Sequence, residues 1–308
     1  MGGLDGQTVL VVGGNGFLGR HLVVRLIQAG ANVHVISRSL PSDNGNVRWW
    51  TGNVAEFPCV RDLMFQVKPD VVYQLASASM GGQDPELVLA TFENDLRTTV
   101  NVLLAARDSG CGRVIITRSL DEPNSNGSAQ IPYSPYAAAK AASGLYGRMF
   151  HHLYRVPVVM LRPFMTYGPG QKDHKVIPYT IQSMLKGETP AIGSGNRRVD
   201  WIYVDDVITG FLAAGSRPEA VGMEIDLGSG TLVTVGEVVE QIGELIPKAP
   251  PPRFLSVPDR ICEPTRLADL KAAKETLDWH PVTSLHEGLS RTIERYRRRG
   301  ARQQVHGD

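Results

Sequence analysis

The sequence predicts an α/β protein with a doubly wound parallel sheet and a smaller, less regular C-terminal lobe. Two observations predict this fold. Short β-branched runs alternate with helix-compatible stretches as far as about residue 164, and such alternation is typical of a parallel sheet covered by helices. A glycine turn joins the first strand-like run to the first helical pattern, as at the start of a βαβ unit.

The first predicted strand covers residues 7–12 and leads directly into that glycine turn. The spacing of Gly13, Gly16 and Gly19 lets backbone N–H groups approach a pyrophosphate and lets the next helix pack closely on the strand. The helical pattern ends at Gly30, a natural terminator. An ordinary strand–helix turn without a ligand is the alternative, but the strand before and the helix after favour a dinucleotide site.

The second predicted strand, residues 33–36, ends where an acidic residue would bind the adenosine ribose of NAD. Ser37, Arg38 and Ser39 stand there instead. An arginine between two hydroxyls suits a 2′-phosphate, so the sequence favours NADP(H), with NAD(H) as the open alternative. A solvated loop arginine would carry no cofactor preference.

Further strand-like runs continue the alternation, and a long helix-compatible stretch from residue 87 to residue 109 lies among them. These runs are Val47–Trp50, Asp70–Leu75, Arg113–Thr117 and Pro157–Leu161. Ligands of doubly wound sheets bind beyond the carboxyl ends of the strands. We therefore expect the loops 77–85 and 119–133 to face the cofactor.

A helix is predicted to begin at Ser134 and Pro135, a good N-cap followed by a residue that suits the first helical position. Its i, i+4 spacing places Tyr136 and Lys140 on one face. Because a fixed ammonium favours the phenolate, such a pair can transfer a proton near neutral pH. A surface tyrosine above a solvated lysine is the alternative, which the rest of the chain disfavours.

Composition limits the partners. The chain has 308 residues, 42% of them apolar, and a formal net charge of +1, so it lacks the field that holds a nucleic acid or an anionic membrane. Its three cysteines form no disulfide framework, and no apolar run reaches membrane-spanning length. We expect a soluble cytoplasmic protein. Because His151 and His152 point in different directions on a helix, no metal site is expected.

A set of motifs, in this order, resembles the extended short-chain dehydrogenases/reductases, the NAD-dependent epimerase/dehydratase family. They are Gly13-x-x-Gly16-x-x-Gly19, Ser119, Tyr136-x-x-x-Lys140, Leu161-Arg162-Pro163 with Tyr167-Gly168-Pro169, Asp200-Trp201-Ile202-Tyr203-Val204-Asp205-Asp206-Val207, and Leu277-Asp278-Trp279-His280-Pro281 with Leu285-x-Glu287-Gly288-Leu289. The resemblance runs nearly end to end. It implies a Rossmann-type dinucleotide-binding domain over residues 1–164 and a substrate-binding lobe over 165–308, with residues 199–215 or so returning to the first domain.

The resemblance also implies site residues. Tyr136 would be the general acid/base, Lys140 would hold the nicotinamide ribose and favour tyrosinate, and Ser119 would hydrogen-bond the reacting oxygen. The implied cofactor-binding residues are Gly13, Asn15, Gly16, Phe17, Leu18, Gly19, Ser37, Arg38, Asn53, Val54, Leu75, Ala76, Ser77, Asn94, Tyr136, Lys140 and Pro163. The implied substrate-binding residues are Met80, Ser119, Asp121, Met165, Val176, Arg198 and Arg266.

Family members mostly act on nucleotide-diphosphate sugars, and they dimerise through a four-helix bundle. The helices expected over residues 87–109 and 135–154 resemble the pair that forms this bundle. The second helix carries small residues that allow close helix approach, namely Ala138, Ala142, Ser143 and Gly147. We therefore expect a homodimer.

Several positions depart from the family's pattern. Asn53 stands where the family often has an aspartate, and Met165 stands where an asparagine usually binds the sugar nucleotide. Val199 replaces the arginine that commonly precedes the Asp-Trp motif, so a shifted Arg198, with Arg266, would hold the diphosphate. Asp121 and Glu122 resemble the Asp-Glu pair of the family's dehydratases, but Leu120 offsets them by one residue. That offset disfavours a dehydratase.

The sequence therefore predicts an NADPH-dependent 4-ketoreductase of a dTDP- or UDP-linked keto-deoxysugar, in which hydride goes to sugar C4 and Tyr136 donates the proton. The alternative is an NAD-dependent 4-epimerase, or a decarboxylase or dehydratase, because an epimerase returns the hydride to the same sugar and keeps its cofactor. A non-catalytic dinucleotide-binding regulator is the alternative of another class. The presence of Ser119, Tyr136 and Lys140 together argues against it.

Overall fold

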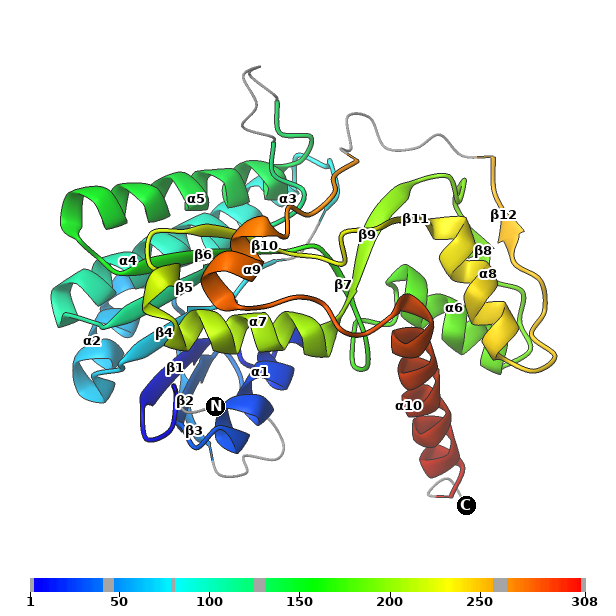
Figure 1. The fold of residues 1–308 in the computed structure, drawn as a ribbon, viewed down its shortest axis with the longest axis horizontal. Coiled ribbons are helices and arrows are strands. Elements are labelled where there is room, and N and C mark those ends of the chain that lie inside the picture. Colours follow the sequence, from blue (N-terminus) through cyan, green and yellow to red (C-terminus); the bar gives the residue numbers. More distant parts are fainter. Residues whose placement is uncertain (1–2, 41–46, 79–80, 124–130, 257–264, 306–308) are drawn as a thin grey trace. The chain divides into compact units, whose positions relative to one another are not determined.

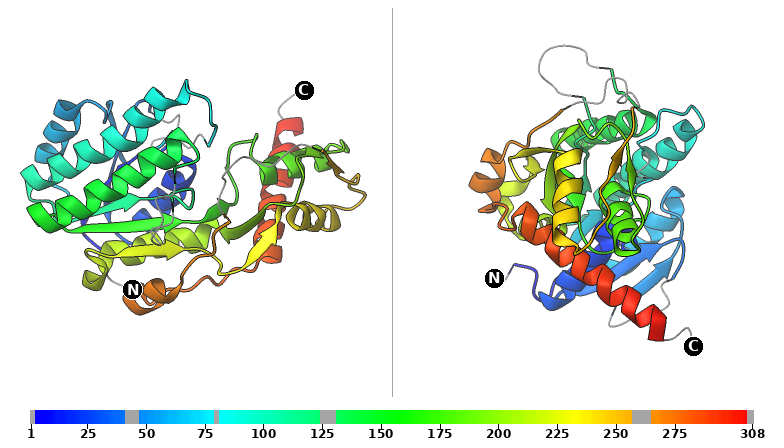
Figure 2. Two further views of the ribbon diagram at one scale, coloured as in Figure 1. Left: turned by 90° about the horizontal axis from the view of Figure 1, so that it is seen from above. Right: turned by 90° about the vertical axis from the view of Figure 1, so that its right-hand side faces the viewer.

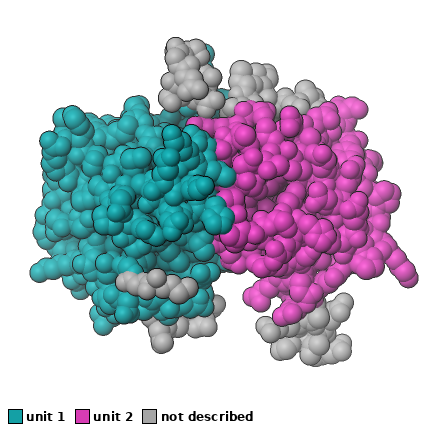
Figure 3. Space-filling model, in the orientation of Figure 1, with its two compact units in different colours: residues 1–163, 208–227, 269–280 teal, residues 164–207, 228–268, 281–308 magenta. Residues whose placement is uncertain are grey.

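The computed structural model describes residues 3–40, 47–78, 81–123, 131–256 and 265–305, which fall into two compact units. Unit 1 comprises residues 1–163, 208–227 and 269–280, and unit 2 comprises residues 164–207, 228–268 and 281–308; Figure 3 colours them separately. The sequence placed the segment that returns to the first domain at about 199–215. In the structure, residues 208–227 and 269–280 belong to unit 1.

Unit 1 is built on a seven-stranded sheet whose order is β3-β2-β1-β4-β5-β6-β10 (Figure 1). The strands are β1 (Thr8–Val12), β2 (Asn32–Ser37), β3 (Arg48–Thr51), β4 (Val71–Gln74), β5 (Arg113–Thr117), β6 (Val158–Pro163) and β10 (Glu224–Leu227). Every neighbouring pair is parallel, so the predicted parallel sheet is confirmed. The chain reverses its direction of winding between β1 and β4, and ligands of such sheets bind beyond the strand ends at this switch point.

Helices cover both faces of this sheet. On one face α2 (Phe57–Val67), α4 (Thr98–Ser109) and α5 (Pro135–Tyr154) enclose a core with alternate strand residues such as Leu10 and Ile116. On the other face lie α1 (Phe17–Gln28) and the part of α7 (Val204–Ser216) that belongs to unit 1, where the Tyr73 hydroxyl donates to the Phe211 carbonyl at 3.2 Å. Unit 1 also contains η2 (Pro218–Ala220) and α9 (Lys271–Leu277).

The stretch 87–109, predicted as one helical region, consists of three consecutive helical elements. α3 (Leu87–Thr91) is followed by a π-helical segment, η1 (Phe92–Arg97), and then by α4. α4 lies beside α5 (Figures 1 and 2). Short π-helical segments change the register of a helix and are frequent at functional sites. Asp95, in the middle of η1, is completely buried.

The described residues of unit 2 form two small sheets, the helices α6, α8 and α10, and the first turn of α7. A three-stranded sheet has the order β11-β9-β7, and β8 pairs with β12. The elements are β7 (Met165–Tyr167), α6 (Val176–Leu185), β8 (Ala191–Ile192), β9 (Arg198–Tyr203), β11 (Leu232–Thr234), α8 (Val235–Leu245), β12 (Arg253–Phe254) and α10 (Leu285–Val305). In the described part of the chain, no helix combines the length and apolar composition that a membrane span requires.

Buried carboxylates hold the loops of unit 2 together. Asp200, on β9, accepts hydrogen bonds from the backbone N–H groups of Ser229, Gly230 and Ala268 at 2.6 to 3.1 Å. Asp206 likewise accepts from the Thr283 backbone at 2.9 Å. Because each carboxylate joins segments distant in sequence, the Asp-Trp motif found in the sequence has a structural role in this unit.

Candidate active site

The glycine turn at the end of β1 packs against the loop after β4. Gly13 adopts a left-handed backbone with φ of +87°, and a Cβ there would lie 2.7 Å from the Ala76 backbone nitrogen. A Cβ at Gly19 would lie 2.3 Å from the Gly13 carbonyl oxygen. Both contacts are too short for any side chain, so the turn requires glycine at these positions.

The turn leaves the start of α1 open to an anion. Gly16 is the N-cap, and it has no side chain that could accept a hydrogen bond from the first helical turn. The N–H groups of Phe17 and Leu18 belong to this first turn. The first turn also contains no acidic side chain. Because an uncapped helix N-terminus attracts a phosphate through its N–H groups and dipole, these residues fit a dinucleotide pyrophosphate.

Hydrogen bonds order the segment after β2, where the adenosine end is expected. The Asn15 amide donates to the Ser37 hydroxyl at 3.0 Å and to the Ser39 carbonyl at 2.7 Å. Arg38 is exposed and reaches the Asn94 side-chain oxygen at 3.4 Å. Asn53 accepts from the Ala55 N–H at 3.2 Å, within the turn that precedes α2. No carboxylate stands at residues 37–39.

The other predicted cofactor residues lie near the strand ends of unit 1. The Leu75 N–H bonds the Val12 carbonyl at 2.9 Å, and the buried Val54 accepts from the Asn101 amide at 2.9 Å. Pro163 is the last residue of β6.

The structure brings Ser119, Tyr136 and Lys140 together at the carboxyl end of β5. Ser134 caps α5 by accepting from the Ala137 N–H at 3.1 Å, which confirms the predicted helix start. Lys140 Nζ lies 5.8 Å from the centre of the Tyr136 ring and donates to the Thr117 carbonyl at 3.0 Å. The Ser119 side chain lies close enough to the Tyr136 hydroxyl to lower its pKa. This arrangement can transfer a proton to or from one substrate oxygen.

The electrostatics of the pair differ from the sequence expectation. Burial raises the pKa of Tyr136, and although Lys140 opposes this effect, the net pKa stays above that of a free tyrosine. Burial lowers the pKa of Lys140, but Tyr136 and Asp95 outweigh it and raise the net value. In the protein alone, the tyrosine is therefore a phenol and the lysine an ammonium at neutral pH.

The side chain that faces Lys140 from η1 belongs to Asp95 and not to Asn94. Asp95 Oδ1 lies 3.4 Å from Lys140 Nζ, whereas the Asn94 amide donates back to the Ala90 carbonyl at 2.7 Å. Asp95 was not among the residues predicted from the sequence. A signal was present, because Thr91, Asp95 and Thr98 share the spacing of a buried helix face, and a charged side chain on such a face is rarely buried without a partner.

Glu122 is held in a buried ion-pair network. The Arg118 guanidinium donates to Glu122 and to Glu224, and the other Glu122 oxygen accepts from the Ser119 N–H at 2.7 Å. Gly144 on α5 makes room for Arg118, since a Cβ there would lie 2.6 Å from the guanidinium carbon. Glu122 therefore fixes the Ser119 backbone. Asp121, by contrast, is partly exposed, and its N–H donates to the Ser119 hydroxyl at 3.2 Å.

Four of the predicted substrate-binding residues belong to unit 2. Met165 on β7 and Val176 at the start of α6 are half-buried. Arg198 is exposed at the start of β9. Hydrogen bonds from Thr234 lower the pKa of Glu237, and Arg198 lowers it further. Arg266 is half-buried. Met80, predicted on the loop after β4, lies outside the described residues.

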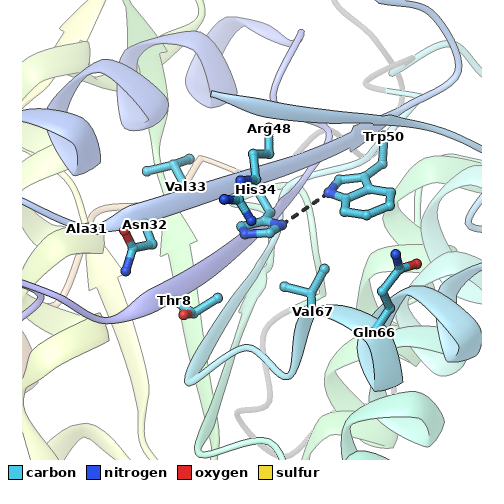
Figure 4. A pocket seen from close by; sticks show the side chains of 9 residues that line it. All are labelled: Thr8, Ala31, Asn32, Val33, His34, Arg48, Trp50, Gln66 and Val67. Atoms are coloured by element: carbon cyan, nitrogen blue, oxygen red, sulfur yellow. Dashed lines mark hydrogen bonds between the residues drawn. The ribbon is translucent and has the colours of Figure 1, made fainter. Parts of the chain in front are cut away.

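A cavity of about 490 Å³ lies at the opposite ends of the strands (Figure 4). It is lined by the starts of β1, β2 and β3 and by the end of α2. Within it the Trp50 indole donates to His34 at 3.1 Å, and burial together with Arg48 lowers the pKa of His34. Because the glycine turn, Tyr136 and Lys140 lie at the carboxyl ends of the strands, this cavity is not part of the candidate site.

Comparisons with known proteins agree with the geometry. Residues 9–228 match the model of the NAD dependent epimerase/dehydratase family. The chain is 29% identical to the UDP-glucose 4-epimerase of Mycolicibacterium smegmatis, over 94% of this chain and 99% of that protein. It is also 29% identical to the dTDP-glucose 4,6-dehydratase of Xanthomonas campestris, over 94% and 93% of the two chains. The structure of MoeE5 with UDP-glucuronic acid and NAD matches with a TM-score of 0.82 and 29% identity, over 95% and 99% of the chains.

Proposed function

Because the chain belongs to the NAD-dependent epimerase/dehydratase family of enzymes, we propose that it is a 4-epimerase of a nucleoside-diphosphate sugar that keeps NAD bound through its cycle. One observation carries this choice within the family. Ser119, Tyr136 and Lys140 are assembled for proton transfer, while the neighbouring Glu122 is held by Arg118. Dehydration needs a further acid/base pair beside the proton-transfer residues, and Glu122 is engaged elsewhere.

The chain's own residues perform the proton chemistry of this reaction. When bound, NAD would supply the hydride acceptor for sugar C4 and the hydride donor for the ketone. Tyr136 takes the proton of the C4 hydroxyl as the ketone forms and gives it back when the alcohol is restored. The Ser119 hydroxyl hydrogen-bonds the same oxygen, and Lys140 holds the ribose. If the hydride returned to the opposite face of the ketone, C4 would be inverted without net consumption of cofactor.

The test of this proposal is the identity of the dinucleotide that leaves the purified protein on denaturation. An enzyme that regenerates its cofactor gains from retaining it, so mass spectrometry is expected to detect NAD with the protein, together with any sugar nucleotide that co-purifies. Protein that releases only NADP(H), or that gains and loses NADPH freely, would contradict the epimerase assignment.

An NADPH-dependent 4-ketoreductase is the second candidate, and Arg38 is the observation that favours it. With Ser37 and Ser39 beside it, Arg38 suits the adenosine 2′-phosphate, and residues 37–39 contain no carboxylate that would repel that group. For this candidate, Arg38→Ala is expected to weaken NADPH binding about tenfold to 100-fold and to leave NADH binding unchanged. The epimerase proposal predicts that wild-type protein binds NADH at least as tightly as NADPH.

Cofactor titrations by calorimetry distinguish the two candidates. The matched control is Arg48→Ala, which removes the same charge at the amino end of β3 and is expected to change neither affinity. An NADPH preference that Arg38→Ala abolishes and Arg48→Ala preserves would place the ketoreductase first. Equal losses for both cofactors in Arg38→Ala would make Arg38 a general contributor without selectivity.

We also propose a homodimer formed through α3, η1, α4 and α5. Large apolar side chains lie exposed on these helices, including Leu89, Phe92, Leu145 and Leu153 at 47 to 74% exposure. Two of the small residues that were predicted to allow close helix approach, Ser143 and Gly147, are instead buried within unit 1. A Cβ at Gly147 would lie 2.5 Å from Ile116, so this glycine serves packing on the sheet.

Light scattering at micromolar concentration is expected to give about twice the 33.6 kDa chain mass. Leu153→Arg places a charge on the proposed interface and is expected to halve the measured mass. Val282→Arg is the matched control, because this side chain is 72% exposed in unit 2. A monomeric wild type, or equal behaviour of the two variants, would refute this interface.

A further inference from the structure

Asp95 and Lys140 form a completely buried pair of opposite charges behind Tyr136. Their side chains are exposed by 0% and 3%, and Oδ1 of Asp95 lies 3.4 Å from Lys140 Nζ. The same ammonium donates to the Thr117 carbonyl at 3.0 Å, at the end of β5. The lysine ammonium therefore has two oxygen partners within the protein.

The Asp95 carboxylate is itself fixed by the loop that follows β4. The Ser77 hydroxyl donates to Oδ1 at 2.5 Å and the Ala78 N–H donates to Oδ2 at 3.2 Å. On the backbone of the same residue, the carbonyl accepts from the Thr99 and Ser143 hydroxyls at 2.7 and 3.3 Å. Asp95 thus connects three segments: the loop after β4, the π-helical turn, and α5 with its proton-transfer residues.

A buried ion pair is a poor device for stability alone. The desolvation of both charges offsets most of their attraction, and apolar residues of equal volume often stabilise a fold as well or better. Buried charges next to a tyrosine that transfers protons instead change the ionisation of that tyrosine. The position of Asp95 therefore points to a role in the chemistry of the site.

The charged groups that act on Tyr136 come from three segments. Lys140, on α5, favours the phenolate, whereas Asp95 on η1 and Asp121 after β5 favour the phenol. Glu122 acts on Lys140, in the same direction as Asp95. Since Asp95 sits directly against Lys140, its negative charge cancels much of the field that the lysine alone would exert on the tyrosine.

We propose that Asp95 is a positioning residue of this active site, which fixes the Lys140 ammonium and keeps the Tyr136 hydroxyl protonated in the protein without cofactor. The inference rests on the proposed role of Tyr136 as the acid/base. The Asp95 carboxylate neutralises most of the Lys140 charge, and Tyr136 therefore keeps its proton in the protein without cofactor. The positive charge of an oxidised nicotinamide, once bound, would then favour the phenolate at the moment when a base is needed.

Asp95→Asn separates charge from shape, because the amide is isosteric with the carboxylate. With the lysine charge unopposed, Tyr136 is expected to ionise at lower pH than in the wild type. The measurement is the phenolate absorption during an alkaline titration of the cofactor-free protein. Subtracting the same titration in a Tyr136→Phe background isolates the signal of this one tyrosine from the other eight.

Glu93→Gln is the matched control, because it removes one negative charge from the same π-helical segment. Glu93 is 39% exposed at its side chain and pairs with Arg97 at 2.8 Å, so solvent screens it and the Tyr136 titration is expected to stay at the wild-type position. If Asp95→Asn leaves the titration unchanged, or if Glu93→Gln shifts it equally, the proposed role of Asp95 is wrong.

If Asp95→Asn alone does not fold, the same question is answered in a Lys140→Gln background. There Asp95 keeps its two donors, Ser77 and Ala78, and the double variant Asp95→Asn/Lys140→Gln leaves no buried charge without its partner. Tyr136 is expected to ionise at lower pH in the double variant than in Lys140→Gln; an equal or higher pH would refute the inference. These titrations need no sugar, so they stay informative if the proposed substrate class is wrong.

Discussion

Replacing Tyr136 with phenylalanine is expected to reduce turnover about 10²-fold to 10⁴-fold, the usual loss when one positioned acid/base is removed. The ring and its packing at the start of α5 are retained, so the fold and the affinity for the dinucleotide are expected to stay close to the wild type. Turnover is measured as interconversion of the sugar-nucleotide epimers, and dinucleotide affinity by calorimetry.

Tyr146→Phe is the control, since it removes a hydroxyl from the same helix at a side chain that is 40% exposed. It is expected to retain wild-type turnover. A Tyr136→Phe enzyme as active as Tyr146→Phe would show that another group transfers the proton, and the assignment of the site to Ser119, Tyr136 and Lys140 would then fail.

Replacing Arg118 with methionine is expected to lower the free energy of unfolding by about 3 to 5 kcal/mol, because it leaves buried carboxylate charge without its guanidinium. Arg118 is 7% exposed at its side chain and contacts Glu122, whose side chain is fully buried, and Glu224. Methionine fills much of the same volume, so the loss reports charge pairing rather than a cavity. Urea unfolding followed by circular dichroism measures it.

Arg148→Met tests the same network from its exposed side. Arg148 also pairs with Glu224, but its side chain is 49% exposed. Arg148→Met is therefore expected to lower the free energy of unfolding by only about 0 to 1 kcal/mol. The double variant Arg118→Met/Glu122→Gln is expected to recover part of the stability, since no buried carboxylate then lacks its partner. Equal losses in Arg118→Met and Arg148→Met would contradict the buried ion-pair account.

Local patterns in the sequence were sufficient for much of the fold. The β-branched runs and the glycine turn predicted six strands of the parallel sheet, whereas β10 was not predicted. Ser134 and Pro135 predicted the start of α5 to the residue, because capping depends only on neighbours in the chain. The same local spacing placed Tyr136 and Lys140 on one face. Features determined by adjacent residues are those that a single sequence can disclose.

Features that depend on distant contacts were not predictable from the sequence. Arg118 and Glu224 are 106 residues apart in the chain, and nothing local indicates that Gly144 leaves room for the guanidinium. The spacing of Thr91, Asp95 and Thr98 indicates a buried helix face, but it does not show that Asp95 on this face lies against Lys140, which is 45 residues away in the chain. The raised pKa of Tyr136 likewise results mainly from burial, which spacing in the sequence does not reveal.

The central claim, that C4 of a nucleoside-diphosphate sugar is inverted with its own hydride, is tested most directly by proton NMR in deuterated water. The purified protein, with NAD, is incubated with UDP-glucose and with further UDP- and dTDP-hexoses. We expect one of these sugars to reach an equilibrium mixture of C4 epimers, with protium retained at C4 and no net change in the amount of reduced dinucleotide. Stoichiometric oxidation of NADPH by a 4-keto sugar, or formation of a 4-keto-6-deoxy product with loss of water, would contradict the account.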